Sequence, residues 1–243
     1  MEIPLEIKTE DGFVLKGFLH FPKTKRDKYP LIIFVHQFST THLLWAKFSE
    51  EMNEMGFATF LFDLRGHGLS TLKNGKEVKV IQMKEQSLAH FFYIFRKSNE
   101  RIDFSKIPDD IVQWINVLEK YKNIDRQKII IIGSSLGATS SIPVVIYKDL
   151  SAVVSISPSS GVIVGKERFE QALKTFKNKF LFISSVNDPI GSGKYCERYI
   201  KLAENGILME ITGRKHGIQL LPDVKDYLIS FLRKLQTMNN NKT

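Results

Sequence analysis

The chain has 243 residues, of which 43% are hydrophobic and 25% are charged, as expected of one globular domain with a sizeable core. Its net charge of +9 comes from scattered lysines, without a long basic block or a nucleic-acid-binding motif, so we expect a solvated basic surface and no nucleic-acid partner. No stretch approaches the ~18 consecutive apolar residues of a membrane span. The N-terminus shows no secretory signal, and the single cysteine, Cys196, rules out an internal disulfide. These features predict a cytoplasmic protein without a membrane span.

The first elements in the chain are predicted to be strands. Alternating polar and apolar residues on both sides of an Asp-Gly turn indicate a β-hairpin formed by residues 3–9 and 13–21. The apolar run at 31–35 is typical of a strand covered on both faces, and a helix is expected over 42–55. The following strand, 57–62, leads into the segment Asp-Leu-Arg-Gly-His-Gly.

The next 39 residues, between Gly68 and Pro108, do not follow the alternation of strands and helices. They contain an apolar cluster of their own that includes Phe91, Phe92 and Phe95. A loop of this length inside a compact domain is usually functional or has its own structure. We predict a small, largely helical cap-like insertion over about 71–107, lying above the carboxyl edge of the sheet. Its aromatic residues would form the core of the insertion or, alternatively, line a substrate pocket.

Helices and strands alternate regularly in the rest of the chain. Helices are expected at 109–121, from the residue after Ser135 to about Tyr147, and at 166–177, 193–204 and 222–236, with strands at 129–132, 152–156, 180–183 and 207–211. This order predicts the α/β fold class, with a mainly parallel, eight-stranded twisted sheet and helices on both of its faces. We expect one domain over residues 1–243.

The strongest motif lies where four isoleucines, 129–132, run into Gly133-Ser-Ser135-Leu-Gly137. A short β-branched run followed by Gly-x-Ser-x-Gly describes a buried strand that delivers a serine onto a sharp turn before a helix. The two glycines remove Cβ atoms that would clash in such a turn. The motif therefore predicts that Ser135 is a catalytic nucleophile.

A serine hydroxyl needs a base within hydrogen-bond reach, and the base needs a third group to orient it. Of the six histidines, only His216 follows the last predicted strand, in a glycine-bracketed loop at its carboxyl end. Asp188 lies just beyond the preceding strand. Active sites of open α/β sheets lie at this edge, and the order Ser135, Asp188, His216 is that of α/β-hydrolases. We predict that these three residues form a catalytic triad.

The tetrahedral intermediate of acyl transfer also needs hydrogen-bond donors for its oxyanion. We expect the N–H of Leu136, at the start of the helix after the nucleophile, and the N–H of Phe38, in the loop after the strand at 31–35. Gln37, in the same loop, would narrow the site or add a donor. His36 competes with His216 as the base, but its place at the start of this loop favours a structural hydrogen bond.

With the segment Asp63-Leu-Arg65-Gly-His67-Gly68, these motifs make the chain resemble an α/β-hydrolase over about residues 9–236. It is most similar to small serine esterases of the dienelactone-hydrolase-like and carboxylesterase group. The resemblance implies structural support from Arg65 and His67. Two features depart from the family: Gln37 stands where a glycine is usual, and dienelactone hydrolases use a cysteine where this chain has Ser135.

The predicted function is that of a serine hydrolase, which cleaves carboxylic esters of small to medium acyl groups through an acyl-enzyme. Its expected partner is a small-molecule ester substrate. The reaction requires neither a metal nor an organic cofactor. A peptidase, a thioesterase or an acyltransferase could use the same triad. For a peptidase, Glu85 and Glu100 are possible anchors for a charged substrate terminus. A binding protein on a hydrolase scaffold is the alternative from another class.

Overall fold

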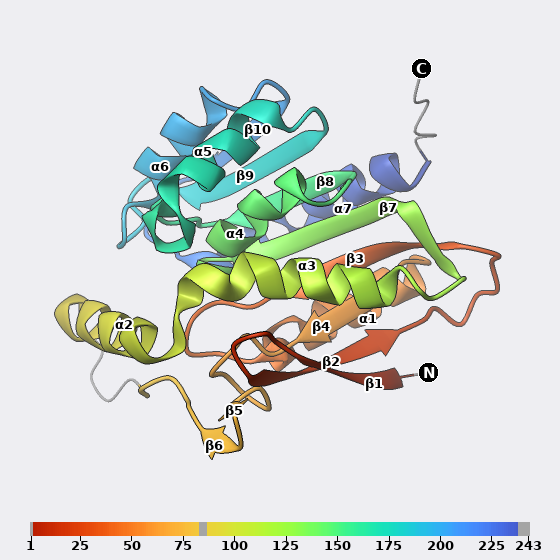
Figure 1. Cartoon of the computed structure of the whole chain (residues 1–243). Helices are drawn as coiled ribbons and strands as arrows, with labels where there is room; N and C mark the ends of the chain where they lie inside the picture. The colour runs from red at the N-terminus through yellow and green to blue at the C-terminus, as the bar shows by residue number, and fades with distance from the viewer. Residues whose placement is uncertain (1, 83–86, 238–243) are drawn as a thin grey trace.

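The computed structural model describes residues 2–82 and 87–237, and its centre is a single mixed sheet (Figure 1). The strand order is β10-β9-β8-β7-β3-β4-β2-β5-β6, with β1 paired to β2. All neighbouring pairs from β10 to β4 are parallel, whereas β2 is antiparallel to both β4 and β1. The strands are Glu2–Lys8 (β1), Phe13–His20 (β2), Tyr29–Val35 (β3), Ala58–Phe62 (β4), Leu72–Lys73 (β5), Lys76–Glu77 (β6), Ile124–Ser134 (β7), Ala152–Ile156 (β8), Lys179–Ser185 (β9) and Gly206–Ile211 (β10).

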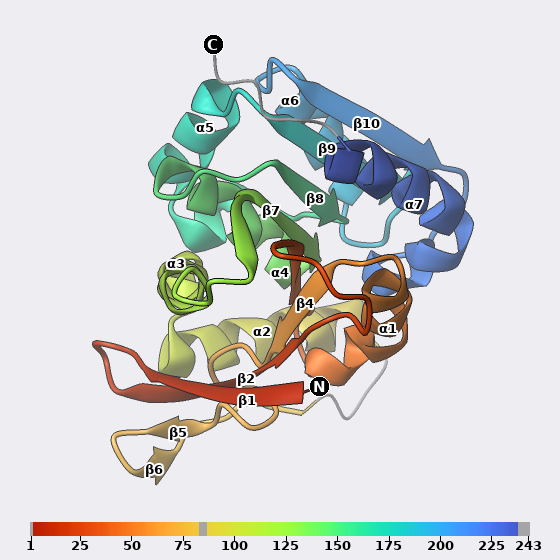
Figure 2. The same ribbon diagram turned by 90° about the vertical axis from the view of Figure 1, so that its right-hand side faces the viewer.

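Helices cover both faces of the sheet, as predicted (Figure 2). One face is covered by α1 (Ala46–Glu54) and α7 (Leu221–Thr237), and the other by the remaining helices of the alternating region. Those helices are α3 (Ile107–Leu118), α4 (Leu136–Ser141), α5 (Lys166–Thr175) and α6 (Ser192–Ile200). The predicted fold class is therefore confirmed.

The isoleucine run in β7 explains why both faces need cover. Ile129 and Ile131 pack into the core on the α3 side, while Ile130 and Ile132 pack into the core on the α1 and α7 side. Successive side chains of a strand point to opposite faces, so a strand that is apolar throughout is stable only between two layers of helices. This double burial fixes the strand end that carries Ser135.

Two details differ from the expectations drawn from the sequence. The sheet has the eight expected strands and, in addition, the two-residue strands β5 and β6, which form a small hairpin at its edge. The helix after Ser135 does not reach Tyr147 as one piece, because α4 ends at Ser141 and a 3₁₀ turn, Ile142–Ile146, follows. Pro143 in that turn lacks an N–H and cannot continue α-helical hydrogen bonding.

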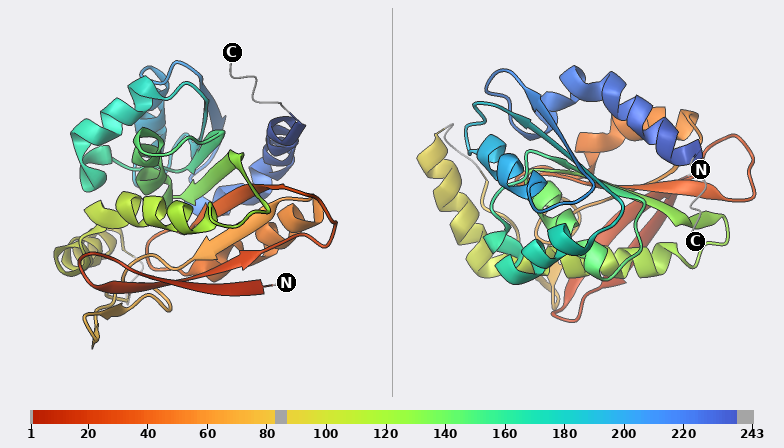
Figure 3. Two further views of the ribbon diagram at one scale, coloured as in Figure 1. Left: turned by 45° about the vertical axis from the view of Figure 1, so that its right-hand side comes forward. Right: turned by 90° about the horizontal axis from the view of Figure 1, so that it is seen from above.

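The segment between β4 and α3 contains the β5–β6 hairpin and helix α2 (Leu88–Ile102), and Figure 3 shows α2 lying beyond the end of the sheet. Ser87 caps the N-terminus of this helix, its hydroxyl accepting a hydrogen bond from the N–H of His90. Ile94, Ser98 and Ile102 are buried along one face of α2. In the described part of this segment, α2 is the α-helix and the β5–β6 hairpin precedes it. None of the helices in the described residues is long and apolar enough to cross a membrane.

Candidate active site

Ser135 lies in a strained turn between β7 and α4. Its φ of 51° and ψ of −111° fall outside the usual regions for a residue with a side chain. A Cβ on Gly133 would lie 2.6 Å from the carbonyl carbon of Gly137, and a Cβ on Gly137 would lie 2.4 Å from the carbonyl oxygen of Val35. Both glycines are thus required by close backbone contacts. The turn has the geometry that the motif predicts.

The structure brings Ser135, His216 and Asp188 into one hydrogen-bonded chain. His216 Nε2 lies 2.8 Å from Ser135 Oγ, and His216 Nδ1 lies 2.7 Å from Asp188 Oδ2. Because an ionised carboxylate only accepts hydrogen bonds, Nδ1 carries the proton and Nε2 is left to accept the serine proton. The three residues come from different strand ends, after β7, β9 and β10.

Asp188 is held in its ionised form. Burial alone would raise the pKa of this carboxyl, but the hydrogen bond and the charge of His216 outweigh that effect, and the Ile190 N–H and the Ser157 hydroxyl add to them. The pKa of Asp188 is lowered from its ordinary value as a result. An ionised Asp188 can orient the imidazole and stabilise the imidazolium that proton transfer would form.

The two backbone N–H groups expected to bind the oxyanion have no hydrogen-bond partner among the described residues. Leu136 is the first residue of α4, so helical hydrogen bonding leaves its N–H without a partner. The Phe38 N–H makes no hydrogen bond to another described residue. The Phe38 ring is buried against His67, Phe95 and Phe104. These ring contacts hold the loop after β3, whose start lies against the turn after β7, since a Cβ on Gly137 would lie 2.5 Å from the His36 carbonyl oxygen.

Gln37 connects three segments of the site. Its side-chain oxygen accepts hydrogen bonds from Ser134 Oγ at 2.9 Å and from the Ile218 N–H at 3.1 Å. Gly217 (φ 60°) passes so close that a Cβ there would lie 2.3 Å from the same oxygen. The structure thus places the Gln37 oxygen against the loop that carries His216, and not in the lining of the cavity beside Ser135.

Serines at the ends of other strands hold the His216 loop from the remaining sides. Ser185 Oγ donates to the Lys215 carbonyl at 2.6 Å, and the Gly217 N–H donates to Ser157 Oγ at 2.9 Å. Sequence reasoning missed these residues, together with Ser134. Their only signal was a serine at the carboxyl end of an apolar strand.

His36 and His67 support the loop after β3. His36 Nδ1 donates to the Gln37 carbonyl, and its Nε2 accepts from the Leu64 N–H, so the ring makes structural hydrogen bonds. His67 Nε2 accepts from the Ser39 N–H at 3.2 Å. Burial lowers the pKa of His36 well below its ordinary value and the pKa of His67 to about 4. Both rings are therefore neutral near pH 7.

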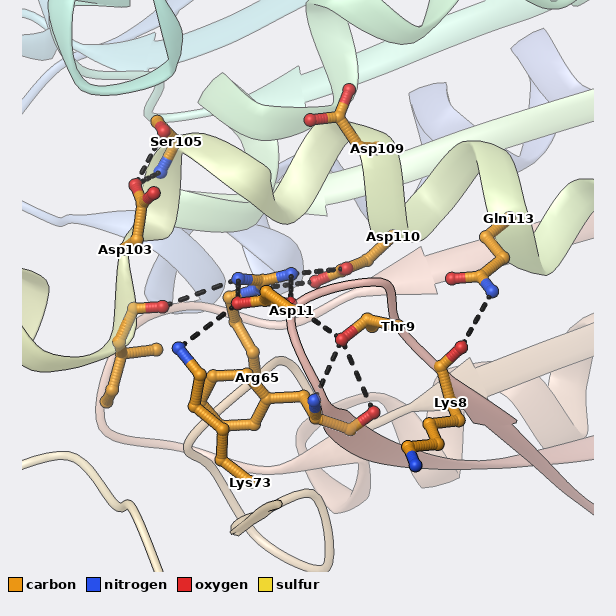
Figure 4. Close-up of polar contacts among 12 residues, drawn as sticks. Lys8, Thr9, Asp11, Arg65, Lys73, Asp103, Ser105, Asp109, Asp110 and Gln113 are labelled. Atoms are coloured by element: carbon orange, nitrogen blue, oxygen red, sulfur yellow. Dashed lines mark hydrogen bonds and ion pairs between the residues drawn. The ribbon is translucent and has the colours of Figure 1, made fainter.

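Arg65 joins the hairpin turn between β1 and β2 to the start of α3 (Figure 4). The buried guanidinium binds the Asp110 carboxylate through two hydrogen bonds of 2.7 Å and reaches Asp11 at 3.0 Å and the Ile102 carbonyl at 3.4 Å. Lys73 of β5 lies 3.2 Å from Asp11. Burial raises the pKa of Asp110 to about 6, while Arg65 acts in the opposite direction. Because Ile102 is the last residue of α2, the hydrogen bond from Arg65 to its carbonyl holds the C-terminal end of that helix.

A cavity of about 580 Å³ opens beside Ser135, under α2. Most of its lining side chains are apolar or aromatic, and the rest are uncharged polar groups. They are Phe91, Phe92, Phe95, Asn99, Ser105, Ser135, Leu136, Ser159, Ser160, Val162, Ile163, Ile190 and Tyr195. A cavity of this size accommodates a small organic molecule.

Other candidate groups lie elsewhere. Cys196 is buried in α6, and burial raises the pKa of its thiol to about 12, so it is an unreactive thiol. Glu100 is exposed, pairs with Lys97 at 2.8 Å and does not line the cavity, and Glu85 lies outside the described residues. In residues 2–82 and 87–237, no group of three or more His, Cys, Asp and Glu side chains is placed to hold a metal ion.

The fold and the site together define a class of protein. Residues 30–181 match the family model described as alpha/beta hydrolase fold, and the chain belongs to this family. Two curated Escherichia coli proteins, both called uncharacterized 31.7 kDa protein in the traX-finO intergenic region, are 33% identical over 111 residues. The match spans 45% of this chain and 30% of each of those proteins.

Solved structures share the fold over nearly the whole chain. Est1E from Butyrivibrio proteoclasticus, solved with ferulic acid bound, has a TM-score of 0.66 at 19% identity, covering 93% of this chain and 98% of its own. Acetyl xylan esterase 1 from a Thermoanaerobacterium species has a TM-score of 0.70 at 15% identity, covering 96% of this chain and 83% of its own. A 2,6-dihydroxy-pseudo-oxynicotine hydrolase has a TM-score of 0.72 at 13% identity, covering 97% of this chain and 68% of its own. These similarities concern the fold.

Proposed function

We propose that this protein is a serine hydrolase that cleaves carboxylic esters through an acyl-enzyme. The observation that carries the proposal is the hydrogen-bonded chain from Ser135 Oγ through His216 to Asp188, of which Ser135 lines a cavity. Ester cleavage is also consistent with the shared fold of Est1E and acetyl xylan esterase 1.

In the first half of the reaction, His216 Nε2 takes the proton of Ser135 as Oγ forms a bond to the ester carbonyl carbon. The carbonyl electron pair moves onto oxygen, and the N–H groups of Leu136 and Phe38 stabilise the oxyanion, each contributing on the order of 3 kcal/mol. When the oxyanion collapses, the bond to the alkoxy oxygen breaks. The alcohol leaves with the proton held by His216.

The second half repeats these steps with water. His216 takes a proton from water as the water oxygen attacks the acyl carbon, and a second oxyanion forms between the same two N–H groups. Its collapse breaks the bond to Ser135 Oγ, which regains its proton from His216. Asp188 keeps the imidazole in the required tautomer throughout.

The chemistry of the cavity favours an ester over a peptide with a charged terminus. A peptidase that recognises such a terminus needs a side chain of opposite charge, but no Asp, Glu, Lys, Arg or His lines the cavity in the described residues. Glu100, the anchor considered above, is paired with Lys97. Thioesterase and acyltransferase activities remain alternatives that use the same triad.

The test is hydrolysis of p-nitrophenyl acetate, butyrate and octanoate by the wild type and by Ser135→Ala. We expect the substitution to abolish turnover, whereas Ser151→Ala, which removes a hydroxyl bonded to the Gln127 carbonyl far from the triad, should leave it unchanged. Activity that survives in Ser135→Ala would refute the proposed nucleophile. A fluorophosphonate should label Ser135 covalently, and absence of labelling would favour a binding protein.

A further inference from the structure

The cavity beside Ser135 is rich in aromatic side chains. Phe91, Phe92 and Phe95 of α2 line one side, and Tyr195 of α6 contributes a fourth ring. The polar atoms in the lining belong to uncharged side chains such as Asn99. Within the described residues, the cavity therefore offers apolar contact and aromatic faces, with no charge to neutralise an ionised ligand.

The position of His216 indicates which part of an ester occupies this cavity. In the proposed reaction His216 Nε2 donates its proton to the departing alkoxy oxygen, so the alcohol must lie on the His216 side of Ser135. Ser135 and Leu136 line the cavity, whereas His216 does not. This arrangement assigns the cavity to the acyl group, which stays bound to Ser135 after the alcohol has left.

From this arrangement we propose that the substrate is an ester with an uncharged acyl group that carries an aromatic ring, bound under α2. The inference rests on the proposed function and specifies its substrate class. Aromatic pairs add about 0.5–1.5 kcal/mol beyond apolar burial alone, so a ring among Phe91, Phe92, Phe95 and Tyr195 is favoured over a saturated group of the same size. An ionised group in this lining would lose its hydration without a partner.

The first experiment compares kcat/KM for three p-nitrophenyl esters that differ only in the acyl group. We expect the 3-phenylpropanoate to exceed the 3-cyclohexylpropanoate by about threefold to tenfold. The 3-(4-carboxyphenyl)propanoate should be at least about 100-fold poorer than the 3-phenylpropanoate. Equal rates for the phenyl and cyclohexyl esters, or tolerance of the carboxylate, would overturn the inference.

The second experiment uses neighbouring residues of α2 as a matched pair. Phe92 and Tyr93 are 51% and 53% exposed, so replacing either one should leave the fold intact, but only Phe92 lines the cavity. Phe92→Leu should lower the ratio of phenyl to cyclohexyl kcat/KM about twofold or more, mainly through KM, while Tyr93→Leu should leave the ratio unchanged. An equal change of this ratio in both variants would show that the cavity does not select for the aromatic ring.

A binding measurement separates this inference from the proposed function. Ser135→Ala retains the cavity without the nucleophile, and calorimetry should show that it binds methyl 3-phenylpropanoate more tightly than methyl 3-cyclohexylpropanoate. Hydrolysis that depends on Ser135 but shows no ring preference would overturn only the substrate class. Ring-selective binding without any Ser135-dependent hydrolysis would overturn only the proposed reaction.

Discussion

Two regions meet at Ser135, and they are held in different ways. The loop that carries His216 is fixed by hydrogen bonds from strand ends, through Ser185, Ser157 and Gln37. Helix α2 contacts the site mainly through aromatic rings. Phe91 of α2, for example, packs against Phe38 of the loop after β3. Hydrogen bonds fix distances and angles, whereas apolar contacts tolerate changes of shape. Substitutions in the loops should therefore affect the chemical step, and substitutions in α2 should affect substrate selection.

The largest expected effect tests the orientation of the base. Asp188→Asn keeps the side-chain size but can hold His216 in the wrong tautomer, and we expect kcat to fall about 10⁴-fold. Steady-state kinetics on the preferred ester measures this effect. Asp226→Asn, an exposed residue of α7, should change nothing, and a similar loss in that variant would contradict the assignment.

The next effect concerns Arg65, which binds the carbonyl of the last residue of α2. Arg65→Met leaves the buried Asp110 without its partner, so we expect the free energy of unfolding to fall by about 3–5 kcal/mol. Urea unfolding measures the loss. Arg198→Met breaks an exposed pair with Glu170 and should cost about 1 kcal/mol or less. Similar losses in the two variants would mean that burial does not determine how much the Arg65–Asp110 pair contributes to stability.

A smaller effect is expected from the buried histidines. The pKa of His67 is lowered from the 6.5 of an unperturbed histidine to about 4 in the folded protein, so the unfolded chain binds more protons between these values. The stabilisation is complete above pH 6.5 and is lost as the pH falls toward 4, by up to about 3 kcal/mol. Urea unfolding at several pH values should show a shallower pH dependence for His67→Gln than for the wild type. An equal pH dependence of the free energy of unfolding in both proteins would contradict the lowered pKa of His67.

The smallest expected effect tests Gln37 as a positioning residue. Gln37→Ala removes the acceptor for Ser134 and Ile218, and we expect kcat to fall about 10-fold while KM stays within about twofold. Gln113→Ala, which removes a side-chain bond to the Lys8 carbonyl far from the site, is the matched control. A change in KM alone would indicate a contact with substrate instead.

Much of the fold was predictable because its signals are local. Short β-branched apolar runs such as 31–35 and 129–132 are typical of strands buried on both faces, and their alternation with amphipathic helices leads to a parallel sheet. The end of α4 at Ser141 was missed although Pro143 is visible in the sequence. The β5–β6 hairpin was missed because strands of two residues carry no periodic pattern.

By itself, the sequence determined the turn at Ser135 and the order of the residues that follow it, because Gly133 and Gly137 lack the Cβ atoms that would clash with the neighbouring backbone. Only the tertiary structure decided how these residues meet. The contacts of Gln37 with Ser134 and Ile218 join positions 97 and 181 residues apart, and no local pattern encodes such a distance. The same holds for the cavity, because a pocket is made by the surfaces of several elements after they have packed.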